Sequence, residues 1–103
     1  MVLESVTVTI REGENAAFEA AFAEASEIVA ASSGFRFLEL HRGLEDARRY
    51  ALLIEWDSVA DHMDGFRNAP GYERWRELLH PFYDGFPTGG HFEAVLQISP
   101  CSC

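Results

Sequence analysis

The side chains with the most chemical potential lie in one stretch of the sequence, from Trp56 to Tyr83. His62 and Phe66 are four residues apart, a spacing that places both on one face of a helix. An unperturbed imidazole titrates at about pH 6.5, so His62 is a candidate catalytic base. Tyr72 is the second candidate catalytic residue, because its hydroxyl could donate a hydrogen bond to a substrate oxygen. Trp75 and Phe66 could stack on an aromatic ring.

Each of these side chains also has a purely structural interpretation. Met63, Phe66 and Trp75 are candidate substrate-binding residues, but apolar side chains at helical spacing more often form a core. His62 lies near a predicted helix start, where it could be solvated or contact a second subunit. Tyr72 could be half-buried with its hydroxyl in water. The sequence leaves both interpretations open.

The remaining histidines define no metal site. His41 and His91 lie on predicted strands, where each could face the pocket or play a structural role, and His41 is a candidate substrate-binding residue. The sequence contains no H-x-x-x-H or C-x-x-C motif, no Gly-rich phosphate loop after a strand and no nucleophile elbow. The spacing of these residues therefore predicts no metal site.

The two cysteines, Cys101 and Cys103, lie in the last three residues. A disulfide across a single intervening residue would be strained, so a disulfide framework is not expected and a reducing cytoplasm is the predicted location. The C-x-C sequence could bind a soft metal, but two ligands on a chain terminus make a weak site. Residues 100–103 are otherwise predicted to be a simple tail.

Hydrophobic periodicity predicts the elements that must position the candidate site. Asn15 is the predicted N-cap of the first helix, which closes at Ser32–Gly34. Ser58 and Asp61 resemble a capping box at the start of the second helix, and Pro70 predicts a break within it. The predicted elements are a strand over 2–11, the first helix, strands over 35–42 and 48–56, a helix from 58 to about 82 with a break at 68–71, and a strand over 91–99.

The order β-α-β-β-α-β predicts an α+β, ferredoxin-like fold. Residues 1–99 should form one domain, with a four-stranded antiparallel sheet and two helices on one face. Strict alternation places Phe35 and Phe37 on one face of the sheet, and Leu38 and Leu40 on the other. Because an apolar outer face needs a cover, we expect two chains to pack sheet to sheet as a homodimer.

The composition restricts the classes of partner. The chain has 103 residues, 48% of them hydrophobic, and a formal net charge of −9. This charge disfavours nucleic acid and anionic membranes, which attract basic surfaces. Residues 1–10 alternate like a strand rather than forming a signal peptide, and no apolar run is long enough to span a membrane.

RNA-recognition domains share this element order and are an alternative to consider for this chain. Their signature is matched by Tyr50 and Ala51 in the third strand. Arg49 stands where glycine is expected, and Leu52 and Glu55 stand where aromatic residues are expected. Together with the acidic net charge, these mismatches favour a protein that acts on a small molecule over one that binds RNA.

The chain resembles the antibiotic biosynthesis monooxygenase (ABM) domain of the dimeric α/β barrel superfamily, over its whole length in strand order and in its motif residues from Trp56 to Glu93. The residues that carry the resemblance are Trp56, Ser58, His62, Phe66, Pro70, Tyr72, Trp75 and Leu78, followed by Pro87 and His91-Phe92-Glu93. The resemblance implies a dimeric barrel with a pocket between the sheet and the second helix.

The resemblance also distinguishes two known activities. Haem-degrading members use an Asn, a Trp and a His at positions that fall near Val6, Phe66 and Arg76, and none of the three matches. Members that oxidise polycyclic phenols to quinones without metal or flavin place polar side chains near His62 and Tyr72. Their pocket Trp corresponds to Phe66.

The resemblance therefore implies a cofactor-independent monooxygenase that acts on a small phenolic or other electron-rich aromatic molecule with O₂ and forms a quinone-type product. In such chemistry a base removes a proton, and the resulting anion passes an electron to O₂. Isomerisation or decarboxylation would use the same groups. The alternative is a non-catalytic dimeric module of the same fold that binds a small ligand or has only a structural role.

Overall fold

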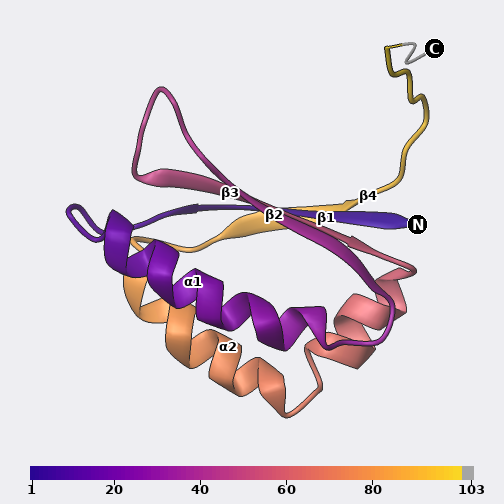
Figure 1. The fold of residues 1–103 in the computed structure, drawn as a ribbon, viewed down its shortest axis with the longest axis horizontal. Coiled ribbons are helices and arrows are strands. Elements are labelled where there is room, and N and C mark those ends of the chain that lie inside the picture. The colour runs from indigo at the N-terminus through magenta and orange to yellow at the C-terminus, as the bar shows by residue number, and fades with distance from the viewer. Residues whose placement is uncertain (101–103) are drawn as a thin grey trace.

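A computed structural model describes residues 1–100 and confirms the βαββαβ order (Figure 1). The predictions for Cys101 and Cys103 lie outside the described residues. The elements are β1 (Val2–Thr9), α1 (Asn15–Ala30), β2 (Phe35–Arg42), β3 (Arg49–Trp56), the π-helix η1 (Asp61–Phe66), α2 (Gly71–Leu79), the short 3₁₀-helix η2 (His80–Phe82) and β4 (Thr88–Phe92). None of the helices in residues 1–100 is long and apolar enough to cross a membrane.

The four strands form one antiparallel sheet in the order β2-β3-β1-β4. Both main helices lie on the same side of this sheet, as predicted (Figure 1). This side is the inner face, and its central residues are those at alternate positions of β1 and β3. None of the helices described in residues 1–100 lies over the opposite, outer face (Figure 1).

The prediction of the last strand was wrong in its boundaries. The strand was expected over 91–99, but β4 spans Thr88–Phe92 and pairs with β1 from Thr7 to Leu3. Gly89 allows this pairing, because a Cβ there would lie only 2.6 Å from the carbonyl oxygen of Ser5. Beyond Phe92 the chain leaves the sheet, where β1 extends only one residue further, to Val2 (Figure 1).

A β-bulge changes the predicted faces of β2. The register shifts between Phe35 and Phe37, so that Phe35 pairs with Trp56 and Leu38 pairs with Ile54. Because alternate residues of β3 share a face, Phe35 lies on the inner face with Leu38, and only Phe37 remains on the outer face. Simple alternation placed Phe35 and Phe37 together, and the extra residue of the bulge breaks that alternation.

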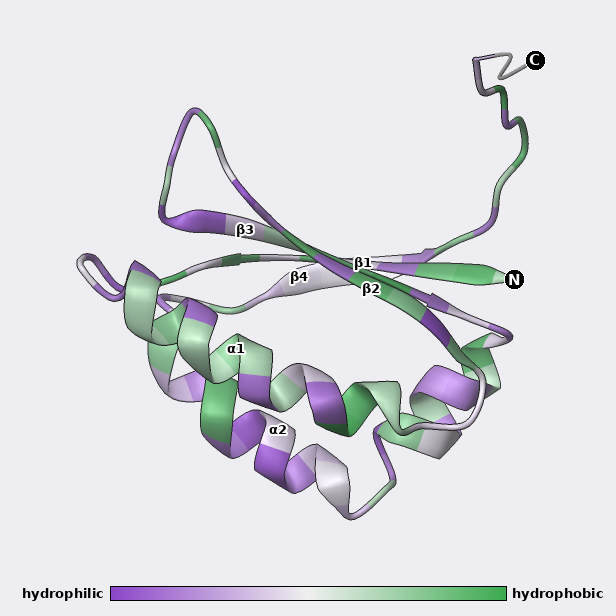
Figure 2. Ribbon diagram, viewed as in Figure 1, coloured by the Kyte–Doolittle hydropathy of each residue, from purple (hydrophilic) through white to green (hydrophobic). Residues whose placement is uncertain are grey.

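The core lies between the inner face and the helices. The predicted stripe on α1 is confirmed, with Phe18, Phe22, Ala25 and Val29 buried. Figure 2 shows hydrophilic and hydrophobic residues alternating along α1 and α2, as amphipathic helices require. From α2, Trp75 and Leu79 are buried, and the ring of Trp75 packs edge-on against Phe22 at 5.6 Å.

The second helical segment begins as its sequence predicts and then departs from α-helical geometry. The backbone N–H of Asp61 donates to the Ser58 hydroxyl at 3.2 Å, which confirms the capping interaction. Residues Asp61–Phe66 form a π-helical turn closed by a hydrogen bond from the Arg67 N–H to the His62 carbonyl at 3.0 Å. This turn buries His62 and Phe66 and leaves Met63 37% exposed, rather than covering Met63 as a core residue.

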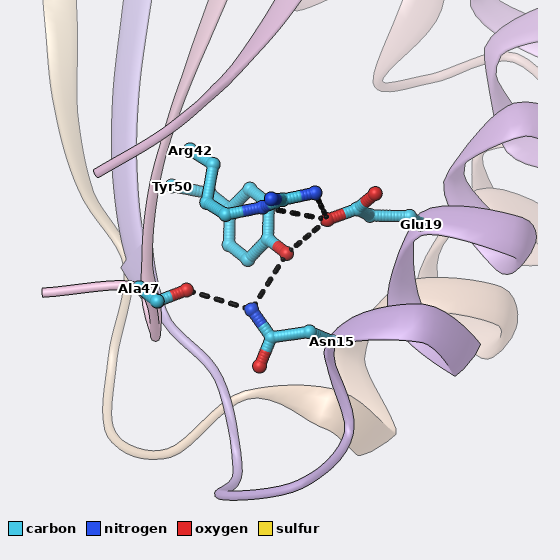
Figure 3. A network of polar contacts seen from close by, with 5 residues as sticks. All are labelled: Asn15, Glu19, Arg42, Ala47 and Tyr50. Atoms are coloured by element: carbon cyan, nitrogen blue, oxygen red, sulfur yellow. Dashed lines mark hydrogen bonds and ion pairs between the residues drawn. The ribbon is translucent and has the colours of Figure 1, made fainter. Parts of the chain in front are cut away.

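A polar network joins α1 to the far end of the β2–β3 hairpin (Figure 3). Asn15 was predicted as an N-cap, but it is the first residue of α1, and its amide donates to the Ala47 carbonyl at 2.7 Å and to the Tyr50 hydroxyl at 2.9 Å. The Tyr50 hydroxyl donates to Glu19, which also accepts from Arg42 at 2.6 Å. The Asn15 side chain therefore hydrogen-bonds the buried Tyr50 hydroxyl instead of capping α1.

The packing of α2 yields a test of the core. Leu79 is completely buried, whereas Leu44 at the tip of the β2–β3 connection is 97% exposed. We expect Leu79→Ala to lower the free energy of unfolding by about 2–5 kcal/mol, since it removes buried methyl groups and leaves a cavity. The matched change Leu44→Ala should alter stability by less than about 0.5 kcal/mol in urea unfolding at one protein concentration.

Candidate functional site

One cavity of about 360 Å³ opens between the inner face of the sheet and the segment from η1 to α2. Its volume is within the range of ligand pockets, about 300–1,000 Å³. Its lining residues come from β1, β3, β4, the η1–α2 segment and the chain before β4: Glu4, Val6, Leu52, Ile54, His62, Met63, Phe66, Arg67, Tyr72, Trp75, Tyr83, Pro87, Gly89, Gly90 and His91. This is the position predicted for a pocket, between the sheet and the second helix.

Glu4 is the most unexpected residue of the cavity wall. Although ionisable, it is only 9% exposed, on the inner face of β1. Its Oε1 accepts a hydrogen bond from the indole Nε1 of Trp56 at 3.0 Å, and its Oε2 lies 3.2 Å from Nε2 of His62. Burial raises the pKa of Glu4 above its ordinary value, and the Trp56 hydrogen bond and the nearby charges of His91 and Arg67 only partly oppose this.

His62 connects Glu4 to His91. Its Nδ1 lies 2.8 Å from Nε2 of His91, so both of its ring nitrogens face a polar partner. The ring is stacked against Trp56, with centroids 5.5 Å apart, and against Phe66, at 6.5 Å. Burial, followed by the charges of His91 and Arg67, lowers the pKa of His62 to about 4, which keeps it neutral at pH 7.

The rest of the wall is aromatic with a few polar groups. Phe66 packs edge-on against Tyr72 at 5.2 Å and against Trp75 at 5.4 Å. The Arg67 guanidinium lies 5.6 Å from the centre of the Tyr72 ring. Burial raises the pKa of Tyr83 to about 12, so this phenol remains a hydrogen-bond donor at neutral pH.

The structure brings together most of the residues singled out in the sequence. His62, Met63, Phe66, Tyr72 and Trp75 all line the cavity. The structure does not bring His41 to it. His41 pairs with Ala51 on the outer face of the sheet, where it is exposed and lies 2.7 Å from Glu39.

Four polar wall residues were not predicted as site residues: Glu4, Arg67, Tyr83 and His91. Glu4 had a detectable signal, because it shares the even positions of the first strand with Val6, Val8 and Ile10, which face the core. A charged residue in an inward-facing series needs a partner, and such residues are enriched at functional sites. Arg67 and Tyr83 had no comparable signal, since loop residues are placed only by the folded chain.

Within residues 1–100, no group of three or more His, Cys, Asp or Glu residues is arranged to hold a metal ion. His62 faces Glu4 with one nitrogen and His91 with the other, so the three side chains do not converge on a common point. The polar side chains of the cavity wall can hold protons and form hydrogen bonds.

The lowered pKa of His62 predicts how stability depends on pH. Between about pH 4 and 6.5 the unfolded chain binds more protons at this residue than the folded one, so stability falls as the pH falls through that window. The loss has an upper limit of about 3 kcal/mol. The raised pKa of Glu4 acts in the opposite direction, with stability falling as the pH rises above 4.5, so a variant is needed to isolate His62.

We expect wild-type protein to lose more unfolding free energy than His62→Gln when the pH is lowered from about 7 to about 4.5. Urea unfolding at both pH values measures this difference. Leu52→Ala is the control, since it removes an apolar wall residue and should destabilise the protein equally at both. Equal losses in wild type and His62→Gln would contradict the conclusion that folding lowers the pKa of His62.

Comparison with known proteins identifies the family. The sequence model of the antibiotic biosynthesis monooxygenase (ABM) family matches residues 1–78. The uncharacterised protein YczJ of Bacillus subtilis (strain 168) is 40% identical over 95 residues, which cover 92% of this chain and 100% of YczJ. A crystal structure of an antibiotic biosynthesis monooxygenase family protein from Bordetella bronchiseptica has 30% identity and a TM-score of 0.88, with 92% of this chain and 97% of that chain covered.

A second solved structure shows the same fold at lower identity. SnoaB, a cofactor-independent oxygenase from Streptomyces nogalater, has 21% identity and a TM-score of 0.85, with 96% of this chain and 97% of SnoaB covered. The family match and the sequence relative together cover most of the chain. The chain therefore belongs to the antibiotic biosynthesis monooxygenase family.

Proposed function

We propose that this protein is a cofactor-independent monooxygenase that converts a small phenolic or other electron-rich aromatic substrate to a quinone-type product. The observation that carries the proposal is the cavity of about 360 Å³, in which two imidazoles in contact and two phenols face an aromatic wall. Its open volume favours an enzyme over a module whose pocket has filled in. SnoaB, with the same fold, is a cofactor-independent oxygenase, which agrees with this chemistry.

The cavity offers each group that the reaction needs. The linked imidazoles of His62 and His91 can together take up the substrate's proton. Tyr72 and Tyr83 can donate hydrogen bonds to the oxygen that becomes an anion. Phe66 and Trp75 offer faces for an aromatic ring. The anion then gives one electron to O₂, and recombination forms the new C–O bond.

The overall reaction balances without a further reductant. In an anthrone-type substrate, one CH₂ group and one O₂ give one carbonyl group and one water. In a phenol, the two hydrogens that end in water come from one C–H and the O–H, and in both cases the substrate supplies all four electrons that O₂ accepts. The chain's tasks are to bind the substrate, to remove its protons and to return protons to the oxygen that leaves as water.

The proposal is tested by oxygen uptake with anthrone and a panel of phenols, with no added metal or flavin. We expect one O₂ consumed per molecule oxidised, and one atom of ¹⁸O₂ in the product. Met63→Trp should reduce kcat/KM by about tenfold or more, because it places a bulky ring at the rim of the cavity. Val59→Trp is the matched control, since Val59 is 43% exposed and lies one turn earlier, outside the cavity lining. Equal activity in the two variants, or no uptake by wild type, would contradict the proposal.

We also propose that two chains form a homodimer through the outer face of the sheet. Leu3, Phe37, Leu53 and Phe92 lie on this face, where none of α1, η1 or α2 covers them. Phe92 is 58% exposed, and Val95, Leu96 and Ile98 beyond it are at least 79% exposed. Exposed apolar surface of this kind usually marks an interface.

Light scattering at micromolar protein concentration tests the dimer. We expect twice the mass of one chain for wild type and the mass of one chain for Leu53→Glu, because a buried unpaired carboxylate opposes association. Leu44→Glu, in the exposed β2–β3 connection, is the control and should remain dimeric. A wild-type monomer would contradict this part of the proposal.

A further inference from the structure

Glu4, His62 and His91 form a continuous chain from the interior to the open side of the cavity. Glu4 and His62 are 9% and 8% exposed, whereas His91 is exposed on the edge strand β4. The contacts are 3.2 Å from Glu4 Oε2 to His62 Nε2, and 2.8 Å from His62 Nδ1 to His91 Nε2. The sheet register fixes the two ends of this chain, because Glu4 and His91 are direct partners on neighbouring strands.

This arrangement leaves His62 without a free nitrogen for a substrate. Nδ1 and Nε2 both face partners within the protein, and the ring also lies against the neighbouring rings of Trp56 and Phe66. His91 differs, because its Nδ1 has no hydrogen-bond partner among residues 1–100 and the residue lines the cavity. The nitrogen available to a bound molecule therefore belongs to His91.

A neutral imidazole has one N–H and one bare nitrogen, so the proton positions along the chain are coupled. In one arrangement Glu4 is ionised and accepts from His62 Nε2–H, His62 Nδ1 accepts from His91 Nε2–H, and His91 Nδ1 is bare. In the other, Glu4 carries a proton directed to His62 Nε2, and His62 Nδ1–H donates to His91 Nε2. One extra proton separates the two arrangements.

We propose that Glu4, His62 and His91 form a proton relay in which His91 Nδ1 removes the substrate's proton and Glu4 stores it. This inference rests on the proposed monooxygenase function and assigns its base. When the substrate's proton joins His91 Nδ1, the Nε2 proton of His91 passes to His62 Nδ1, and the Nε2 proton of His62 passes to Glu4. The substrate keeps the electron pair of the broken bond as an anion, and all three side chains end neutral.

The surroundings of Glu4 suit a group that stores a proton. Its carboxyl is buried against Trp56, and this burial favours the neutral acid. The raised pKa of Glu4 agrees with this role. The charged and titratable groups that act on the relay are His91 from β4 and Arg67 after η1, and both lie on the cavity side. In this scheme His91 is the catalytic residue, and His62 and Glu4 act through it.

The first test does not depend on turnover. We would record ¹⁵N spectra of the histidine rings at pH 7 in the full chain, in wild type, Glu4→Gln and Glu12→Gln. The relay predicts that Glu4→Gln shifts the ring-nitrogen signals of both His62 and His91, whereas Glu12→Gln, at an exposed turn, shifts neither. If Glu4→Gln leaves the His91 signals unchanged, the three groups are not coupled and the relay is wrong.

The second test uses oxygen uptake with anthrone as the probe. His91→Gln should lower kcat/KM by about 10²–10⁴-fold, and added imidazole should restore part of the rate, since a free base can occupy the vacated position. Glu4→Gln should lower kcat by tenfold or more with KM within about twofold of wild type, and imidazole should not restore it. Full activity in His91→Gln would overturn the assignment. An inactive wild type would instead refute the proposed function, and the ring spectra would still decide whether the relay exists.

Discussion

The arrangement of the site depends on the burial of one carboxyl group. A carboxylate taken out of water without partners is strongly destabilising, so Glu4 can occupy the inner face of β1 only where polar groups meet it. The Trp56 indole meets one oxygen and His62 meets the other. The first contact requires the end of β3 beside the start of β1, which the pairing of Val2 with Trp56 provides. The second requires the segment after β3 to bring an imidazole back over the sheet.

The π-helical turn of η1 provides that return. It directs His62 and Phe66 inward, where Trp56, His62 and Phe66 pack with their ring planes within 30° of one another. Such turns are often found at functional sites, because they re-aim a side chain at some cost in regular hydrogen bonding. The same turn therefore brings His62 to Glu4 and places Phe66 in the aromatic wall of the cavity.

At the other end of the inner face, a buried polar group is satisfied by a network of side chains from a helix and a hairpin. The Tyr50 hydroxyl is enclosed by Asn15, Glu19 and Arg42, which fasten α1 to the hairpin (Figure 3). Near Glu4 the sheet edge is instead built from Gly89, whose missing side chain leaves space above Val6. One end of the helix layer is thus held closely to the sheet, and the other stands over a cavity.

Periodicity in the sequence was enough to predict the fold, because α1 and the central strands repeat their apolar residues at regular intervals. It did not predict the features in which a local irregularity interrupts the regular spacing of apolar residues. The bulge moved Phe35 to the other face, and Gly89 paired in a strand despite the poor strand propensity of glycine. Glu4 was not predicted as a site residue because charged residues usually face solvent, although its even position in the first strand is that of an inward-facing residue. His62 was recognised from its type, but only its two contacts show that His91 has the free nitrogen.

The distribution of charge gives the cavity a chemical character different from that of the whole molecule. The chain carries a formal net charge of −9, which repels an anionic substrate at a distance. The cavity wall contains one acid, Glu4, together with Arg67 and two imidazoles. A substrate that approaches as a neutral phenol avoids the external repulsion and meets a base only inside. If Glu4 takes up the substrate's proton, the acid of the wall becomes neutral while Arg67 keeps its charge. The local balance then favours the newly formed anion at the stage of the reaction when the anion must persist long enough to meet O₂.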